Sequence, residues 1–140
     1  MKKTIFTLLI LSAVFSSAFA DRIISPDSLS KGAIQFIQKN FPHQQIQYVE
    51  EDFSEYEIIL EDGTEINIDK RGNWETIKSY QGVNPALLPK NIASYLATSY
   101  PNTIITEVEK DRFNFEVKLS NHMELYFDSK GRFLGQKYDD

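Results

Sequence analysis

Two stretches of the sequence decide the fold: YEIILEDGTEINIDKRGNW at residues 56–74 and FEVKLSNHMELYFDSKGRF at residues 115–133. They align without a gap at an offset of 59 residues, so that apolar, acidic and glycine positions coincide. The same offset pairs residues upstream: Pro26 with Pro85, Phe41-Pro42 with Tyr100-Pro101, and Val49-Glu50 with Val108-Glu109. Ungapped agreement at positions of such different chemistry indicates the duplication of one structural unit. We therefore expect a single domain over residues 21–140, made of two repeats at about residues 25–80 and 84–138.

The two stretches alternate between apolar and polar residues, as does a β-strand with one buried face. In the first copy the apolar face carries Tyr56, Ile58, Leu60, Thr64, Ile66 and Ile68. Asp62-Gly63 predicts a two-residue hairpin between the two runs, and the weaker turn former Asn121-His122 takes its place in the second copy. Further turns are predicted at residues 69–72 and 128–131, before strands that begin at Trp74 and Phe133.

Each repeat begins with an amphipathic helix. Apolar residues spaced i, i+4, i+7 and i+8 form its buried stripe: Leu29, Ala33, Phe36 and Ile37 in one copy, and Leu88, Ile92, Tyr95 and Leu96 in the other. Pro89 would break a helix from within, so we place it at the first helical position, after a short turn led by Asn84-Pro85. By the same alignment Ser30 starts the first helix, and Pro42 and Pro101 end the two helices.

A helix followed by three or four antiparallel strands, repeated twice, predicts an α+β fold. Both helices are expected to pack on one face of the sheet and to leave the other face open. The pattern leaves undecided whether the two repeats share one continuous sheet.

The N-terminus has the features of a signal peptide. Lys2 and Lys3 precede a mostly apolar run over residues 5–15, and Ala18-Phe19-Ala20 supplies small residues for cleavage after Ala20. A membrane anchor would need about 20 apolar residues, and no later segment is long enough either. We therefore expect an exported protein that is periplasmic in a Gram-negative host, with no membrane span in the mature chain.

Composition narrows the classes of function. The chain has no cysteine, which excludes disulfides, thiol catalysis and thiolate metal sites. Residues 1–20 carry two of the 15 Lys and Arg and none of the 20 Asp and Glu, which leaves a formal net charge of −7 for residues 21–140. Nucleic acid is an unfavourable partner for such a chain, and a basic protein surface is a better one.

A set of turn and core motifs covers essentially all of residues 21–140, twice. It comprises Leu88-Pro89, Tyr100-Pro101, Tyr56-Glu57-Ile58, Asp62-Gly63-Thr64-Glu65 and Asp69-Lys70-Arg71-Gly72-Asn73-Trp74. This combination resembles the PepSY-like proteins, whose fold is similar to that of the beta-lactamase inhibitor protein. The resemblance implies a periplasmic or secreted tandem-repeat domain with one open sheet face. It does not imply inhibition of a beta-lactamase, because no inhibitory contact residues match.

No residue pattern predicts catalysis, a metal or a cofactor. The Asp-x-x-Gly turns at Asp69 and Asp128 lack the further oxygen ligands that calcium needs. His43 and His122 do not coincide in the repeat, so we expect two surface histidines without zinc. Acidic runs at residues 50–52 and 107–111 are expected to form a solvated sheet edge rather than a catalytic pair. Known nucleophile, phosphate-loop and zinc motifs are absent, so we expect no enzyme.

The open sheet face is the candidate binding surface. Ile59 and Tyr126 are predicted to be exposed on it, which is typical of a protein contact surface. The candidate residues are Glu57, Ile59, Glu61, Glu65, Asn67, Glu116, Lys118, Glu124 and Tyr126. An ordinary half-solvated sheet would also carry scattered apolar residues. The leading hypothesis is a periplasmic interaction module for a protein or peptide, possibly basic. The alternative is a protein that binds a small ligand or a cation in a groove between the repeats, with Asp69 and Asp128 as first residues to test.

Overall fold

The computed structural model describes residues 21–139, so the predicted signal peptide at residues 1–20 lies outside the described residues. The described elements follow the chain in this order: β1 Arg22–Ile24, η2 Pro26–Ser28, α1 Lys31–Asn40, β2 Ile46–Glu51, β3 Glu55–Leu60, β4 Glu65–Asp69, β5 Trp74–Lys78, η3 Pro85–Leu87, α2 Lys90–Ser99, β6 Ile105–Lys110, β7 Asn114–Leu119, β8 Met123–Asp128 and β9 Phe133–Tyr138. Two helices and an antiparallel sheet confirm the predicted α+β class. The order from α1 to β5 recurs from α2 to β9, which is consistent with the predicted repeat.

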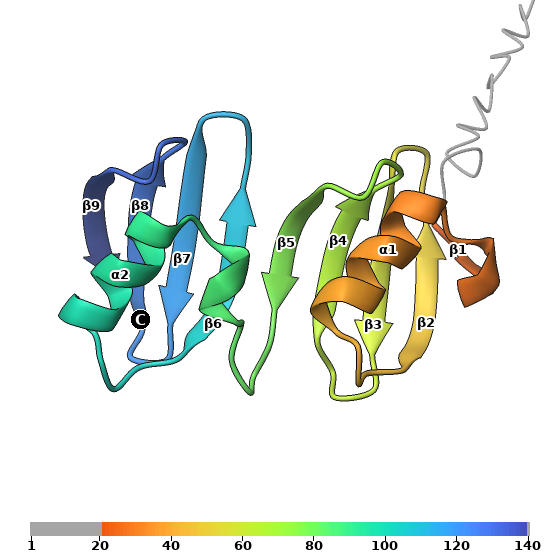
Figure 1. Ribbon diagram of the computed structural model, residues 1–140, viewed down its shortest axis with the longest axis horizontal. Helices are drawn as coiled ribbons and strands as arrows, with labels where there is room; N and C mark the ends of the chain where they lie inside the picture. The colour runs from red at the N-terminus through yellow and green to blue at the C-terminus, as the bar shows by residue number, and fades with distance from the viewer. Residues whose placement is uncertain (1–20, 140) are drawn as a thin grey trace, which may run out of the picture.

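The strands form one continuous sheet in the order β1 to β9, and every strand pairs antiparallel with its neighbour in the sequence. The question that the sequence left undecided is answered by β5 and β6, which pair Thr76 with Glu109, Ile77 with Val108, and Lys78 with Glu107. Figure 1 shows α1 in front of one half of the sheet and α2 in front of the other. The face turned away from the viewer carries no helix among the described residues.

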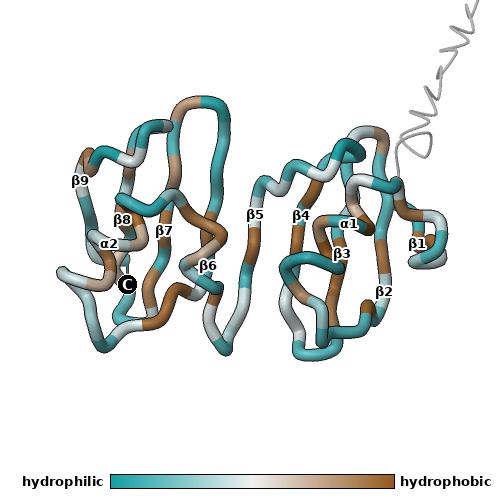
Figure 2. Tube along the Cα trace, viewed as in Figure 1, coloured by the Kyte–Doolittle hydropathy of each residue, from teal (hydrophilic) through white to brown (hydrophobic). Residues whose placement is uncertain are grey.

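The core lies between the helices and the strand residues that face them. Figure 2 shows hydrophobic stretches within the strands and hydrophilic ones at most turns. The six residues predicted for the apolar face of residues 56–68 are all buried. The helices contribute Ala33 and Ile37 from α1, and Ile92 and Leu96 from α2. Burial of each large aliphatic side chain stabilises the fold by about 1.5–3 kcal/mol, so this layer is what fixes the register of the sheet.

The start of each helix is stabilised differently in the two halves. The Ser30 hydroxyl accepts a hydrogen bond from the Ala33 N–H (3.3 Å), and the Ser30 N–H donates to the Tyr56 hydroxyl (3.3 Å). At the corresponding positions Pro89 has no N–H and Phe115 has no hydroxyl, so donor and acceptor are both missing. Ser30 and Pro89 are the N-cap residues, so the helices begin at Lys31 and Lys90, one position after the predicted starts.

The predicted two-residue hairpin after β3 is wrong, because the loop holds three residues. The Gly63 N–H donates to the Leu60 carbonyl (2.9 Å), and the Leu60 N–H donates to the Thr64 carbonyl (2.9 Å). Gly63 has a φ of 85°, the conformation of a type I turn closed by a glycine bulge. The Asp62 carboxylate stabilises this loop by accepting the Thr64 N–H (2.9 Å). His122 takes the place of Gly63 in the second copy, with a φ of 67°.

The beginning of each helix packs beneath a turn of the sheet. A Cβ on Gly72 would come within 2.6 Å of the Gly32 carbonyl oxygen, and a Cβ on Gly32 would overlap the Arg71 carbonyl. In the second half Asn91 replaces Gly32 and donates from Nδ2 to the Lys130 carbonyl (2.7 Å). Backbone contact in one half thus corresponds to a side-chain hydrogen bond in the other.

We expect Gly32→Ala to lower the free energy of unfolding by about 1–3 kcal/mol, because the new methyl group must displace the backbone of the β4–β5 turn. Gly135→Ala is the matched control, since a Cβ there meets no atom within 4 Å. Urea unfolding followed by circular dichroism measures both. Equal unfolding midpoints for the two variants would contradict the close packing at Gly32.

Candidate functional site

The open sheet face is organised in rows that run across the strands. One row, which we call the charge ladder, holds one charged residue from each strand of β4 to β9: Glu65, Lys78, Glu107, Lys118, Glu124 and Lys137. The adjacent row, which we call the acidic row, runs from β2 to β8: Glu50, Glu57, Asn67, Thr76, Glu109, Glu116 and Tyr126. The strand register places the members of each row directly opposite one another.

The charge ladder is neutralised by its own contacts. The Lys118 ammonium lies 3.4 Å from a carboxylate oxygen of both Glu107 and Glu124, and Lys137 lies 3.3 Å from Glu124. Glu124 is only 5% exposed, and its carboxylate also accepts a hydrogen bond from the Tyr126 hydroxyl (3.0 Å). Burial acts to raise the pKa of Glu124, but the hydroxyl and the two ammonium groups hold it below the ordinary value. From β5 to β9 the ladder is therefore a structural feature whose charges are already paired.

The acidic row places like charges opposite one another. Glu50 faces Glu57 across β2 and β3, and Glu109 faces Glu116 across β6 and β7. Burial raises the pKa of Glu57, and the charges of Glu50 and Glu65 raise it further. The pKa of Glu109 is raised by the hydrogen bond it shares with Glu107, by burial, and by the charges of Glu107 and Glu116. Directly opposed like charges destabilise a sheet, so this row is electrostatically unfavourable until a cation approaches it.

The two acidic pairs are related by the 59-residue offset and lie four strands apart. At 4.7–4.9 Å per strand, their centres are separated by about 19 Å. Beside the second pair the surface forms a hollow of about 350 Å³, whose lining includes Glu75, Asn114 and Tyr126. The open face therefore offers two equivalent anionic positions to a ligand that spans the sheet.

Several sequence expectations for this face need correction. Ile59 is 7% exposed, so the prediction of an exposed aliphatic residue is wrong; it lies on a central strand between Tyr48 and Glu65, whose side chains flank it. Tyr126 is partly buried because its hydroxyl turns toward Glu124. Glu61 lies in the β3–β4 turn rather than on the face.

The remaining predicted residues do lie on this face: Glu57, Glu65, Asn67, Glu116, Lys118 and Glu124. Sequence reasoning missed the residues that complete the two rows: Glu50, Thr76, Lys78, Glu107, Glu109 and Lys137. Residues 107–111 were expected at a sheet edge, but β6 pairs with both β5 and β7. The match of Val49-Glu50 with Val108-Glu109 was the signal that could have placed two of the missed acids on the face.

The candidate metal-binding residues serve other purposes. Asp69 accepts hydrogen bonds from the N–H groups of Arg71 and Asn73, and Asp128 from those of Lys130 and Arg132, all at 2.9 Å. Among residues 21–139 no group of three or more His, Asp or Glu side chains is arranged to hold a metal ion. The same residues include no helix that is long and apolar enough to cross a membrane.

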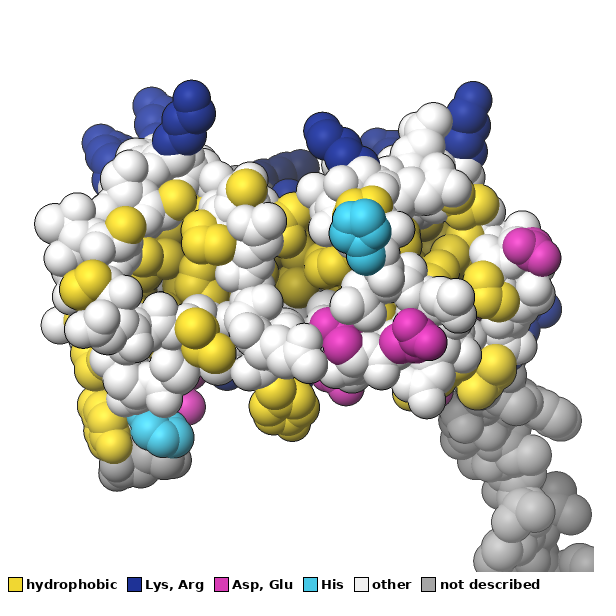
Figure 3. Space-filling model, turned by 60° about the horizontal axis from the view of Figure 1, so that its bottom comes forward, with side chains coloured by type: hydrophobic (Ala, Val, Ile, Leu, Met, Phe, Trp, Pro, Cys, Tyr) yellow, Lys and Arg dark blue, Asp and Glu magenta, His cyan; other side chains and the backbone are white. Residues whose placement is uncertain are grey.

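A second hollow lies on the helix side, between the β5–β6 connection and α2. It has a volume of about 680 Å³ and is lined mainly by apolar atoms, with Val83, Ala93 and Ile104 among its residues. Figure 3 shows hydrophobic side chains at the bottom of the recesses on this side of the molecule. This hollow is the place that a small apolar ligand would take.

The protonation of Glu55 is expected to affect stability. Its pKa is raised from 4.5 to about 7, first by the hydrogen bond shared with Glu75, then by burial and by the charge of Glu75. The unfolded chain releases this proton at lower pH than the folded chain, so the native protein loses stability as the pH rises from 4.5 to about 7. We expect Glu55→Gln to remove this loss, so that the melting temperature of the variant rises relative to native as the pH is increased from 4 to 8.

The control for this measurement is Glu61→Gln, an exposed residue of the β3–β4 turn. Melting curves recorded across the same pH range at constant ionic strength provide the comparison. If native protein and Glu55→Gln keep a constant difference in melting temperature throughout the range, the shared proton between Glu55 and Glu75 is disproved.

Comparison with known proteins places the chain in a family. A family model described as "Putative beta-lactamase-inhibitor-like, PepSY-like" matches residues 21–70 and 54–135. No curated protein matches the chain. The family description is that of an inhibitor-like fold and names no catalytic activity.

Solved structures from Bacteroides species share the fold. A "putative calcium-regulated periplasmic protein" from Bacteroides thetaiotaomicron is 33% identical, with a TM-score of 0.78 over 84% of this chain and 96% of that one. A "putative periplasmic protein from DUF2874 family" of Bacteroides vulgatus is 30% identical, with a TM-score of 0.75 over 84% and 96% of the two chains. A "putative periplasmic protein of unknown function" of Bacteroides vulgatus is 26% identical, with a TM-score of 0.77 over 84% and 99%. With a family model that spans most of residues 21–135 and a relative at 33% identity, the chain belongs to the PepSY-like, beta-lactamase-inhibitor-like family.

Proposed function

We propose that the chain is a non-enzymatic periplasmic module that binds a basic protein or peptide across its open sheet face. The observation that carries this proposal is the repetition of one unfavourable acidic pair, Glu50 with Glu57 and Glu109 with Glu116. Both pairs lie on a face that no helix of residues 21–139 covers. The periplasmic location is supported by the signal-peptide pattern and by the names of the similar Bacteroides proteins.

A basic ligand would relieve the repulsion within each pair. A lysine or arginine placed between the two carboxylates of a pair lowers the raised pKa of Glu57 or Glu109 and gains an ion pair with each carboxylate. Two pairs about 19 Å apart correspond to about six residues of an extended chain at 3.3 Å per residue. The ligand that fits best therefore carries two basic clusters about six residues apart, and it bridges the two halves of the sheet.

The open face would select its ligand by the positions of the ligand's basic residues rather than by the ligand's net charge. In the charge ladder Glu107 and Glu124 are already paired with lysines, so these two carboxylates offer little to an incoming cation. The directly opposed acidic pairs lie in one row, and this limits where a basic segment can lie. Rim charges of this kind mainly set the association rate and its dependence on salt.

We expect Glu57→Gln combined with Glu116→Gln to weaken the binding of a peptide with two lysine pairs about six residues apart. Two exposed ion pairs of ~0.2–1 kcal/mol each give a loss of at least about twofold in affinity. Fluorescence anisotropy at low and physiological salt measures the dissociation constant. The protein should be purified from the periplasm so that it carries its natural N-terminus.

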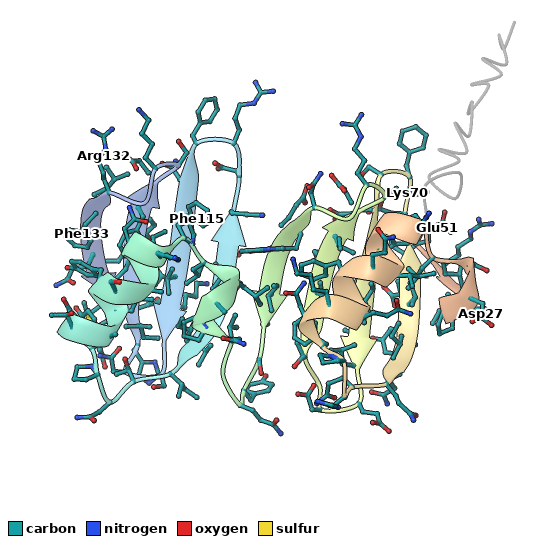
Figure 4. All side chains as sticks on the ribbon, viewed as in Figure 1. Asp27, Glu51, Lys70, Phe115, Arg132 and Phe133 are labelled. Atoms are coloured by element: carbon teal, nitrogen blue, oxygen red, sulfur yellow. The ribbon has the colours of Figure 1, made fainter. Side chains whose placement is uncertain are left out.

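The matched control is Asp27→Asn combined with Asp139→Asn, which removes the same formal charge from exposed positions outside the two rows. Asp27 lies in η2, at the β1 end of the molecule (Figure 4). If both double variants lose affinity equally, the peptide responds to net charge alone and the proposed face is wrong.

A divalent cation is the second candidate ligand, and the name of the relative from Bacteroides thetaiotaomicron favours it. The hollow beside β6 has Glu75, Glu109 and Glu116 in its lining, although these described side chains are not arranged as a ready-made metal site. Calcium takes six to eight oxygen ligands, so water or a bound partner would have to complete its coordination.

We expect calcium, if it binds in this hollow, to raise the melting temperature of the native protein and to leave that of Glu109→Gln unchanged. Magnesium serves as the control ion, because it demands a stricter octahedral geometry than three side chains of a sheet surface supply. A calcium effect of the same size in Glu109→Gln would place the ion elsewhere, and the absence of any effect on the native protein would remove this candidate.

A further inference from the structure

The turns at one end of the strands differ in amino-acid composition from the rest of the molecule. Because every strand runs antiparallel to the next, the β2–β3, β4–β5, β6–β7 and β8–β9 turns all lie at the same edge, which is the upper edge in Figure 1. We call it the turn edge. Both helices also begin there, since Gly32 packs against the β4–β5 turn and Asn91 bonds to the β8–β9 turn.

Two phenylalanines project from the turn edge. Phe53 is 82% exposed in the β2–β3 turn, and Phe113 is 67% exposed in the β6–β7 turn. Their turns lie four strands apart, which corresponds to about 19 Å. Two large aromatic side chains at the same edge can both insert into one flat surface. A single exposed aromatic residue elsewhere would give only one point of insertion.

The turn edge is rich in exposed cations. Two of them are held by carboxylates: Lys70 Nζ lies 2.8 Å from Glu51, and Arg132 Nε lies 2.6 Å from Asp128. Exposed basic residues stand in three of the four turns and at both helix starts: Lys31, Lys70, Arg71, Lys90, Arg112, Lys130 and Arg132. Figure 3 shows dark blue side chains along the upper boundary of both halves, and Figure 4 shows Lys70 and Arg132 at this edge, one in each half. Seven of the basic residues of a chain with net negative charge are thus gathered at one edge.

The aspartates of the same turns are directed into the loops. Asp52 accepts the N–H groups of Ser54 and Glu55 (both 2.8 Å), and Asp111 accepts those of Phe113 and Asn114 (2.7 and 2.8 Å). These backbone hydrogen bonds lower the pKa of both carboxyl groups. Asp69 and Asp128 bond in the same way to the other two turns. The acids therefore hold the turns, and the outermost groups of the edge are the phenylalanine rings and the basic side chains.

We propose that the turn edge docks on an anionic lipid bilayer, with Phe53 and Phe113 in the headgroup region and the surrounding Lys and Arg side chains against lipid phosphates. Stable attachment of a peripheral protein requires two signals, and this edge combines apolar insertion with a basic cluster. The acidic row lies on a face of the sheet and not in the turns, and salt screening over a length of about 8 Å weakens its repulsion of the bilayer.

The first test measures flotation of the protein, purified from the periplasm, with vesicles of phosphatidylcholine containing one-third phosphatidylglycerol. Vesicles of pure phosphatidylcholine are the control. We expect the native protein to float only with the anionic vesicles, and Phe53→Ser combined with Phe113→Ser to reduce the bound fraction several-fold. Tyr80→Ser is the matched control, because Tyr80 is 92% exposed but lies in the β5–β6 connection at the opposite edge.

A second pair of variants tests the basic residues. Arg71→Gln combined with Arg112→Gln is expected to reduce binding and to weaken its dependence on salt, whereas Lys39→Gln, at the end of α1, should leave both unchanged. Circular dichroism melting curves confirm that each variant is folded. The proposal is overturned if the native protein binds both vesicle types equally or neither, or if Tyr80→Ser loses as much binding as the phenylalanine variant.

Discussion

Three residue pairs between β5 and β6 hold the two halves of the protein in one register. Ile77 and Val108 meet there on the helix side and are fully buried, so the join is part of the core rather than a flexible connection. Because the strands on both sides keep this register, the acidic pairs lie in the same row and the four turns of one edge lie in line. A slip of one residue at this join would turn the acids of β6 toward the helices and would separate both surfaces.

The two halves solve the same physical problems with different residues. The hydrogen bond between the Ser30 N–H and the Tyr56 hydroxyl has no counterpart at Pro89 and Phe115, where the donor and the acceptor are lost together. A buried donor without an acceptor would be costly, so joint loss preserves the balance. Likewise the Asn91 side chain supplies the contact that Gly32 makes through its backbone. In both cases the residue at the helix start and its contact with the sheet differ together between the two halves.

The sequence predicted those parts of the fold that depend on local periodicity. Alternation placed Ile58, Ile66 and Ile68 in the core, and the prolines marked the helix ends, because both signals arise from neighbouring residues. The position of each strand within the sheet was harder to predict from the sequence. Nothing local distinguishes a central strand from an edge strand, so β6 was misplaced and Glu107 and Glu109 were missed as part of the open face. The burial of Ile59 escaped prediction for the same reason, since it depends on the side chains of adjacent strands.

The sequential order of the strands has a mechanical consequence. β1 and β9 form the two opposite edges of the sheet, so tension between the ends of the described chain acts across the strands, along the direction of their hydrogen bonds. Such a load breaks the hydrogen bonds between neighbouring strands one after another, and it does not have to break many of them at the same time. Under tension between its two ends, the sheet would therefore lose strands from β1 or β9 inward at modest force. The two halves would separate where β5 pairs with β6 through three residue pairs.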